Sequence, residues 1–150
     1  MKINTKHFGE VEINQEKIIK FENGVPGFPE SKNYILLGDM QANQPFCWLQ
    51  STDNSETAFT VTSPYVFYNE YKPDVPDEEM ANIMGANDTV SDISVFSIMV
   101  VPNDVKETTL NLKAPVIINS KTNKGAQIIV NNEEYGVRHR ITDLVEASAM

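Results

Sequence analysis

A chain of 150 residues is long enough for one hydrophobic core and too short for two comfortable domains, so we expect a single domain over residues 1–150. Apolar residues make up 41% of the sequence, but no run reaches the ~18 consecutive apolar residues of a membrane helix, and no apolar signal region follows Lys2. These features exclude a transmembrane helix and predict a cytoplasmic protein. The single cysteine, Cys47, cannot form an intramolecular disulfide, which agrees with a reducing compartment.

The net charge of −9 is concentrated in the middle of the chain. Residues 33–105 carry eleven acidic side chains and one lysine, whereas the two ends together are close to neutral. A surface of this kind repels phosphate backbones and attracts basic proteins. The charge therefore argues against direct binding of nucleic acid. It leaves open either a basic protein partner or acidity that serves only solubility.

The first third of the chain predicts short strands separated by turns. Alternating apolar residues over 3–13 indicate a hairpin that turns near Gly9. Residues 17–21 (KIIKF) and 34–37 are two further strand-like runs. Between them, residues 24–29 (GVPGFP) form a constrained turn, because proline fixes φ and glycine permits a positive φ.

The middle third contains strands of two kinds. Residues 46–49 (FCWL) are apolar at successive positions, which predicts a central strand buried on both faces. Residues 59–62 alternate, as expected of a half-exposed strand. Residues 65–71 have strand propensity and carry three tyrosines between two prolines.

One helix is predicted, between Asp74 and Gly85. Asp74 is placed to cap the free amides at its start, and Gly85 is placed to end it. The acidic residues of the first turn suit the positive end of the helix dipole; they are Asp77, Glu78 and Glu79. An apolar stripe with i, i+3, i+4 spacing follows, formed by Met80, Ile83 and Met84.

The last third returns to strands. Residues 93–101 form a long apolar strand, and 111–119 with 125–130 form a strand pair joined by a short polar connection. Residues 135–141 are predicted as a final strand. About ten short strands and one helix predict an all-β fold: a small closed β-barrel or sandwich-like domain with one short helical insertion.

No constellation of reactive residues supports catalysis. Cys47 lies inside an apolar strand, where a thiol stays protonated and inert. His7 and His139 match no metal-ligand spacing. The three acidic residues 77–79 are either a cation site or, as we favour, partners of the helix dipole. We therefore predict no catalytic residue, metal site or cofactor.

Three short sequence blocks point to a known family. They are residues 21–28 (FENGVPGF), 45–51 (PFCWLQS) and 111–119 (NLKAPVIIN). In this order they are similar to the F-x-x-G-[IL]-PGF, PF-x-x-LQS and NL-x-AP-x-x-IN motifs of the FliW family of bacterial flagellar assembly factors. Each block alone is weakly specific, but the ordered set resembles this family over most of the chain.

The resemblance implies a non-enzymatic, cytoplasmic regulator. Members of this family bind the RNA-binding translational repressor CsrA and stop it from repressing the flagellin message. They also bind newly made flagellin, so that secretion of flagellin frees the regulator. The acidic middle of the chain is consistent with a basic, RNA-binding partner.

The sequence is also compatible with two other functions. One is a small-molecule or carbohydrate-binding β-barrel with Trp48 and the tyrosines 65, 68 and 71 around a pocket. The other is a general secretion chaperone that uses the apolar stripe of residues 80–84 as its groove.

Six residues are the candidates for partner contact. Phe28 is held rigidly by its turn, and it serves either as an exposed anchor or as a plug over the end of the barrel. The other five form an acidic patch with one aromatic neighbour; they are Tyr71, Asp74, Asp77, Glu78 and Glu79.

The block over residues 111–119 is predicted to be structural. We expect Leu112, Val116 and Ile118 to point into the core. Pro115 should lie at a bulge or an edge, because it lacks an amide. The two asparagines of the block, at positions 111 and 119, should hydrogen-bond to the backbone where the strand bends.

Overall fold

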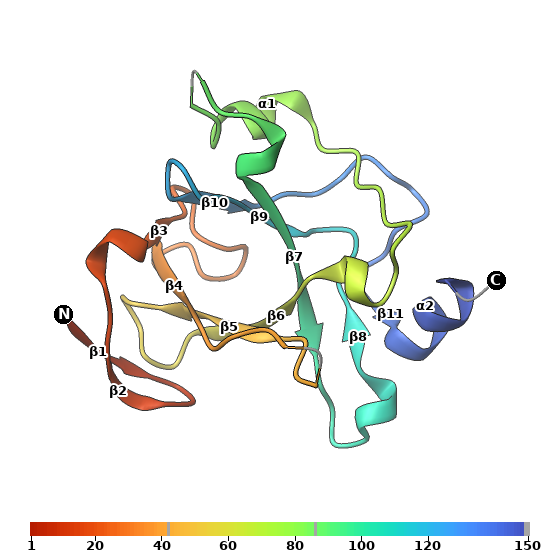
Figure 1. The fold of residues 1–150 in the computed structure, drawn as a ribbon, viewed down its shortest axis with the longest axis horizontal. Helices are drawn as coiled ribbons and strands as arrows, with labels where there is room; N and C mark the ends of the chain where they lie inside the picture. The colour runs from red at the N-terminus through yellow and green to blue at the C-terminus, as the bar shows by residue number, and fades with distance from the viewer. Residues whose placement is uncertain (42, 86, 149–150) are drawn as a thin grey trace.

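The computed structural model describes residues 1–41, 43–85 and 87–148, and its centre is a β-sheet that closes into a ring (Figure 1). The strands of the described chain are β1 (Lys2–Thr5), β2 (Gly9–Glu12), β3 (Ile19–Lys20), β4 (Asn33–Leu37), β5 (Cys47–Ser51), β6 (Ala58–Thr62), β7 (Ile93–Val100), β8 (Thr109–Leu110), β9 (Val116–Asn119), β10 (Lys124–Gln127) and β11 (His139–Arg140). The α-helices are α1 (Asp77–Ala81) and α2 (Ile141–Ser148). Short 3₁₀ turns are η1 (Gln15–Lys17), η2 (Pro64–Val66), η3 (Val90–Asp92) and η4 (Val105–Glu107).

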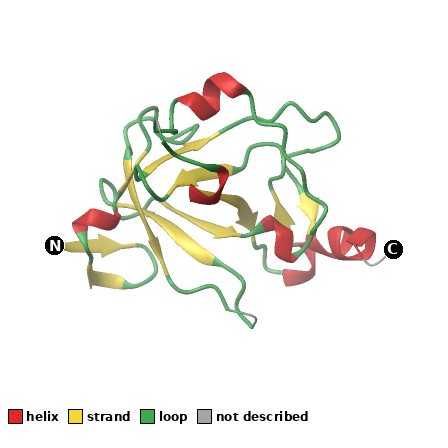
Figure 2. Ribbon diagram, turned by 45° about the horizontal axis from the view of Figure 1, so that its top comes forward, coloured by secondary structure: helices red, strands yellow, loops and turns green. Residues whose placement is uncertain are grey.

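The ring is closed by the long strand β7. Neighbouring strands follow the order β7-β6-β5-β4-β3-β10-β9, and β9 pairs back with β7. The first half of β7 pairs with β9, and the second half pairs with β6 and β8. Every pairing in the ring is antiparallel except that of β3 with β10, which is parallel at one position, Lys20 with Lys124. Helices α1 and α2 lie outside the ring of strands, whereas one short 3₁₀ turn overlaps the strands in the view of Figure 2. The prediction of an all-β fold, either a small closed barrel or a sandwich-like domain, is confirmed, and the ring-like sheet corresponds to the closed form.

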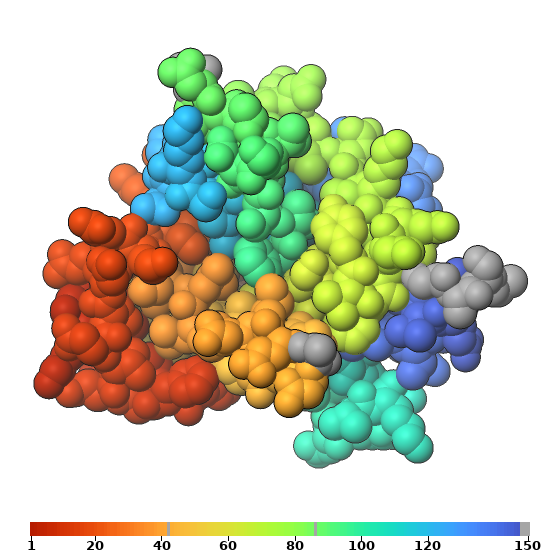
Figure 3. Space-filling model, in the orientation of Figure 1, coloured from red at the N-terminus to blue at the C-terminus, as the bar shows by residue number. Residues whose placement is uncertain are grey.

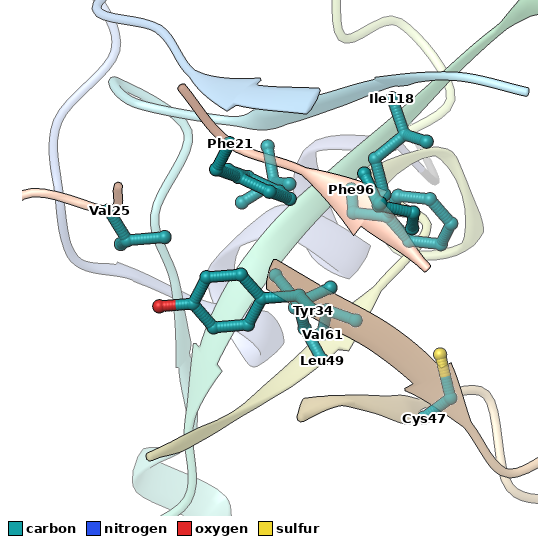
Figure 4. Packing of buried hydrophobic residues seen from close by; sticks show 10 residues of the cluster. Phe21, Val25, Tyr34, Cys47, Leu49, Val61, Phe96 and Ile118 are labelled. Atoms are coloured by element: carbon teal, nitrogen blue, oxygen red, sulfur yellow. The ribbon is translucent and has the colours of Figure 1, made fainter. Parts of the chain in front are cut away.

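The main core lies inside this ring. Figure 4 shows large side chains from several strands gathered between them. Phe21 and Tyr34 make an edge-to-face contact with ring centroids 5.0 Å apart. The ring of Phe21 lies so close to Gly125 that a β-carbon there would come within 2.8 Å of it. Glycine is therefore the residue that lets β10 pass over the aromatic core.

The predicted central strand is β5, between β4 and β6. Cys47 and Leu49 are buried, whereas Phe46 and Trp48 are half-buried, so burial on both faces is partial. Burial raises the pKa of the Cys47 thiol to about 11, which keeps it protonated. The interpretation of Cys47 as a structural residue agrees with this environment.

The block over residues 111–119 has the predicted structural role. Leu112, Val116 and Ile118 are buried. The Oδ1 atoms of Asn111 and Asn119 accept backbone amides two and three residues further along the chain, which fixes the bends at both ends of the block. Pro115 precedes the first residue of β9, where the missing amide interrupts no ladder.

The predicted helix is shorter than the sequence suggested and starts later. It covers only Asp77–Ala81, and Pro76 occupies the N-cap position. Asp74 does not cap it: the Asp74 amide donates to Asn132 Oδ1 (2.6 Å), and its carbonyl accepts the Asn131 amide (2.8 Å). The reason is the proline, since a residue before proline is driven into an extended conformation. The chain therefore reaches α1 as an extended segment.

Other predicted elements also differ from the structure. Residues 65–71 form no strand; η2 and the turns after it take their place, with Pro64 at the first helical position. The third strand is limited to β3, because Asn14 accepts the Glu16 amide and starts η1 instead. The predicted last strand is reduced to β11, and α2 follows it at once. The predicted hairpin at the N-terminus is confirmed, with Gly9 at φ 64°.

Candidate partner-binding surface

The acidic residues predicted for partner contact lie on an exposed segment that leads into α1. Asp74, Asp77, Glu78 and Glu79 are all exposed, and within the described chain none of their carboxylates takes part in an ion pair. In Figure 3 the yellow-green stretch that leads to this helix lies on the surface of the face shown. The structure thus presents four unneutralised charges within six residues.

The loop over residues 131–135 holds this acidic segment in place. Asn132 Nδ2 donates to the Lys72 carbonyl (3.0 Å), and the Lys72 amide donates to the Tyr135 hydroxyl (3.0 Å). The Lys113 ammonium donates to the Asn132 carbonyl (2.7 Å), which ties the loop to the turn that follows β8. The backbone of the segment is therefore fixed, while its carboxylates remain in solvent.

Tyr71, the aromatic candidate, lies beneath this surface and not on it. Its side chain is only 3% exposed, and its hydroxyl donates to the Leu112 carbonyl (2.7 Å). Its ring packs against Tyr135 (centroids 4.8 Å apart) and Tyr65 (5.8 Å). Burial raises the pKa of Tyr71 well above its usual range. In this position Tyr71 supports the acidic segment from below.

Phe28 lies on the surface at the tip of its turn. The turn is closed by the Phe28 amide, which donates to the Val25 carbonyl (2.7 Å), and Gly27 has the predicted positive φ, at 90°. The Phe28 side chain is 43% exposed and packs edge-on against Phe59, with centroids 5.4 Å apart. Val25, not Phe28, is the buried residue of the turn.

A groove of about 310 Å³ separates this turn from α1. One wall is the turn over residues 22–29, and the other is the end of α1, with Glu79, Asn82 and Ile83. The floor is β10, from Lys124 to Gln127. The structure therefore brings the Phe28 turn and the acidic helix to opposite sides of one groove, which the sequence did not reveal.

The wall formed by α1 is attached to the barrel by a buried polar network. Asn119 Nδ2 donates to the Ile83 carbonyl (2.9 Å) and to Asp88 Oδ2 (2.8 Å). The same Asp88 oxygen accepts the Gly85 amide, and the Asp88 side chain is only 4% exposed. These hydrogen bonds hold the pKa of Asp88 below its usual range, with the Gly85 amide as the largest cause. Asp88 was not singled out from the sequence, because a carboxylate between two loops carries no local signature.

Two alternatives from the sequence lose support in this geometry. The apolar stripe of residues 80–84 faces inward: Ile83 is buried against Ile117 and Ile128, so it forms no open groove for client helices. Trp48 packs against His7, Phe8 and Phe46, and neither it nor the three tyrosines line the groove described above.

The described residues include no group of three or more side chains that could hold a metal ion. His139 Nε2 accepts the Gly136 amide (2.7 Å), and burial lowers the pKa of this histidine. Among the described helices, none is long and apolar enough to cross a membrane. The protein is thus a small ring-closed β-barrel with an acidic surface segment and a groove beside it.

Comparison with known proteins identifies the family. Residues 2–141 match the model of the FliW protein family. The chain is 44% identical over 143 residues to a flagellar assembly factor FliW from Caldanaerobacter subterraneus subsp. tengcongensis, which covers 95% of this chain and 94% of that protein. It is 41% identical over 143 residues, with the same coverage, to one from Thermoanaerobacter pseudethanolicus. A crystal structure of the flagellar assembly factor FliW superposes with a TM-score of 0.82 at 34% identity and covers 94% of this chain and 96% of that one. The chain belongs to the FliW family of flagellar assembly factors.

Proposed function

We propose that this protein is a non-enzymatic, cytoplasmic regulator of flagellum assembly that binds CsrA, prevents its repression of flagellin mRNA, and exchanges CsrA for flagellin. Membership of the flagellar assembly factor family supports the link to flagella. The observation that carries the choice of CsrA is the rigid acidic segment with its four unpaired carboxylates. An RNA-binding protein carries positive charge, and such a partner meets complementary potential here.

The mechanism that we propose is electrostatic. When the acidic segment binds near the RNA surface of CsrA, its charge disfavours phosphate at the same place. Flagellin then needs a different kind of contact, since it is not an RNA-binding protein. We propose that flagellin uses apolar contacts that include Phe28 and so releases CsrA.

The test is an RNA-release assay with purified components. CsrA is bound to a labelled flagellin leader RNA, and this protein is added, followed by flagellin. We expect addition of the protein to free the RNA and flagellin to restore the repressed complex. A protein that binds neither CsrA nor flagellin at micromolar concentration contradicts the proposal.

Charge variants make the assay specific for the acidic segment. Glu78→Lys with Glu79→Lys should lose RNA release. The matched control is Glu56→Lys with Glu146→Lys, which makes the same change in net charge at exposed residues outside the segment. Equal loss in both double variants would show that only the total charge matters.

A further inference from the structure

The floor of the groove is the edge of a β-strand that is only partly covered. Strand β10 pairs with β9 at all four of its residues, but with β3 only at Lys124. The chain turns away immediately after β3, because the Phe21 amide donates to the Lys32 carbonyl and the Gly24 amide to the Phe21 carbonyl. Beyond Lys124, the outer edge of β10 therefore faces the groove.

The hydrogen-bond register identifies the main-chain groups on that edge. The Ile128 amide donates to the Pro115 carbonyl (3.0 Å), so these two residues form a hydrogen-bonded pair. In an antiparallel ladder such pairs alternate, so Ala126 and Lys124 also hydrogen-bond to their partners on β9. Gly125 and Gln127 lie between those pairs and direct their main-chain groups to the other side. Within the described chain, no hydrogen bond reaches the Gly125 carbonyl or the amide and carbonyl of Gln127.

Gly125 is buried and Gln127 is half-buried, so the amide and carbonyl of Gln127 are the groups that a further strand can reach and use as a template. The walls limit what can reach them: the proline-containing turn stands on one side and the end of α1 on the other. A folded sheet cannot enter between two such walls, whereas a single extended chain can. Addition of a strand to an exposed edge is a general mode of peptide recognition.

We propose that this groove binds an extended segment of a partner protein, which adds to β10 as a further strand. Side chains of a strand alternate between its two faces. One set would point to the buried wall at Val25 and must be small and apolar. The other set would point to the α1 wall, where the carboxylate of Glu79 forms no ion pair within the described chain and favours a lysine or arginine. Lys20 and Lys124 also line the groove, and Lys124 is paired with Glu22.

The proposal concerns the chemical class of the ligand and stands apart from CsrA and flagellin. It holds or fails whichever protein supplies the segment. The probe is therefore a library of synthetic nine-residue peptides that alternate alanine or valine with lysine or arginine. Binding is followed by nuclear magnetic resonance on the ¹⁵N-labelled full chain.

We expect library peptides to bind and to slow hydrogen exchange of the Gln127 amide. At ten times the dissociation constant the slowing should be about tenfold, because the amide then exchanges only from the unbound protein, whose population falls by the factor 1 + [L]/Kd. A peptide whose amide facing the Gln127 carbonyl is N-methylated cannot donate a hydrogen bond to that carbonyl, so it should not protect the Gln127 amide. Failure of the whole library to bind at millimolar concentration, or binding with unchanged exchange at Gln127, overturns the proposal.

Two matched pairs of variants locate the site. Asn82→Trp fills the groove and should abolish binding, whereas Ala81→Trp at the neighbouring exposed residue, outside both the groove and the acidic segment, should not. Glu79→Lys should switch preference from basic to acidic peptides, whereas Glu56→Lys, at an exposed residue outside both the groove and the acidic segment, should not. Equal effects within either pair would overturn the strand-edge site.

Discussion

At the scale of single residues, Gly125 marks the closest approach of a strand to the aromatic core. A β-carbon at this position would meet the Phe21 ring at 2.8 Å and Ile19 at 3.1 Å. Gly125→Ala should therefore destabilise the protein by roughly 1–3 kcal/mol, as overpacking does. Urea unfolding measures this loss. Gly136→Ala is the control, because its new methyl group makes only ordinary contact with His139 at 3.6 Å; equal losses in both variants would contradict the explanation.

The Phe28→Ala variant tests whether Phe28 contributes to binding or to the stability of the fold. Its half-exposed ring loses mainly one edge-on contact with Phe59 on truncation, so Phe28→Ala should cost about 0.5–1.5 kcal/mol. That is well below the roughly 3–5 kcal/mol of a buried phenylalanine. We expect a small fall in melting temperature and loss of flagellin binding. A fall in melting temperature of many degrees with intact binding would make Phe28 a structural residue after all.

Asp88 gives the stability a dependence on pH. Its pKa is lowered in the folded state by the Gly85 amide and the Asn119 amide. The stabilisation is therefore complete above the ordinary aspartate pKa of about 3.9 and is lost as the pH falls through the lower, folded value. Asp88→Asn should lower the melting temperature at pH 7 and flatten its decline below about pH 4. Parallel melting curves of the two proteins from pH 7 to pH 2 would rule out this role.

At the scale of elements, the β9–β10 hairpin contributes buried residues to the main core of the barrel, as its sequence predicted. Ile118 is 5% exposed within the main core, so Ile118→Ala should cost roughly 2–5 kcal/mol. Ile129 offers a matched control just after the same hairpin, because it is 65% exposed; Ile129→Ala should change stability by less than about 0.5 kcal/mol. Chemical denaturation compares the two. If Ile118→Ala kept full stability but lost a partner, the block would be a binding face.

The sequence was informative wherever a local pattern decides the structure. Alternation located the N-terminal hairpin, and the composition of the Gly24–Pro29 segment required the positive φ that Gly27 adopts. Prediction from the sequence failed where two local preferences of the chain conflict. Pro76 favours an extended approach to α1 over the cap expected from Asp74. The apolar residues Ile141 and Leu144 of α2 are too few to give a helical period of their own.

The candidate surface was predictable only in part, for a similar reason. Acidic residues are visible in a sequence, and the exposure of Asp74 and of residues 77–79 follows from their charge. The groove is not visible, because its walls come from segments far apart in the chain and its floor depends on a single parallel pair between Lys20 and Lys124. The burial of Tyr71 also depends on distant partners, Leu112 and Tyr135.

At the scale of the whole molecule, the uneven charge predicts how association depends on salt. Steering by the acidic segment should fade as the screening length falls from ~10 Å at 0.1 M to ~3 Å at 1 M. Reversal of Glu78 and Glu79 should slow association with CsrA at low salt and leave the fold unchanged. Flagellin binding, which we expect to rely on apolar contact, should be affected less. Stopped-flow rates that are flat with salt and insensitive to the reversal would remove electrostatics from the mechanism.

The single parallel pair between β3 and β10, which joins the first and last strands of the ring in chain order, has a consequence for how the chain folds. Lys20 and Lys124 are more than a hundred residues apart, so every other neighbour in the ring can form before this one. Long-range pairing of this kind carries a large loop-closure cost and slows folding. During synthesis the pairing of β3 with β10, the seam of the barrel, cannot form until β10 has left the ribosome. In the finished protein, the same seam is the place where the barrel should open first.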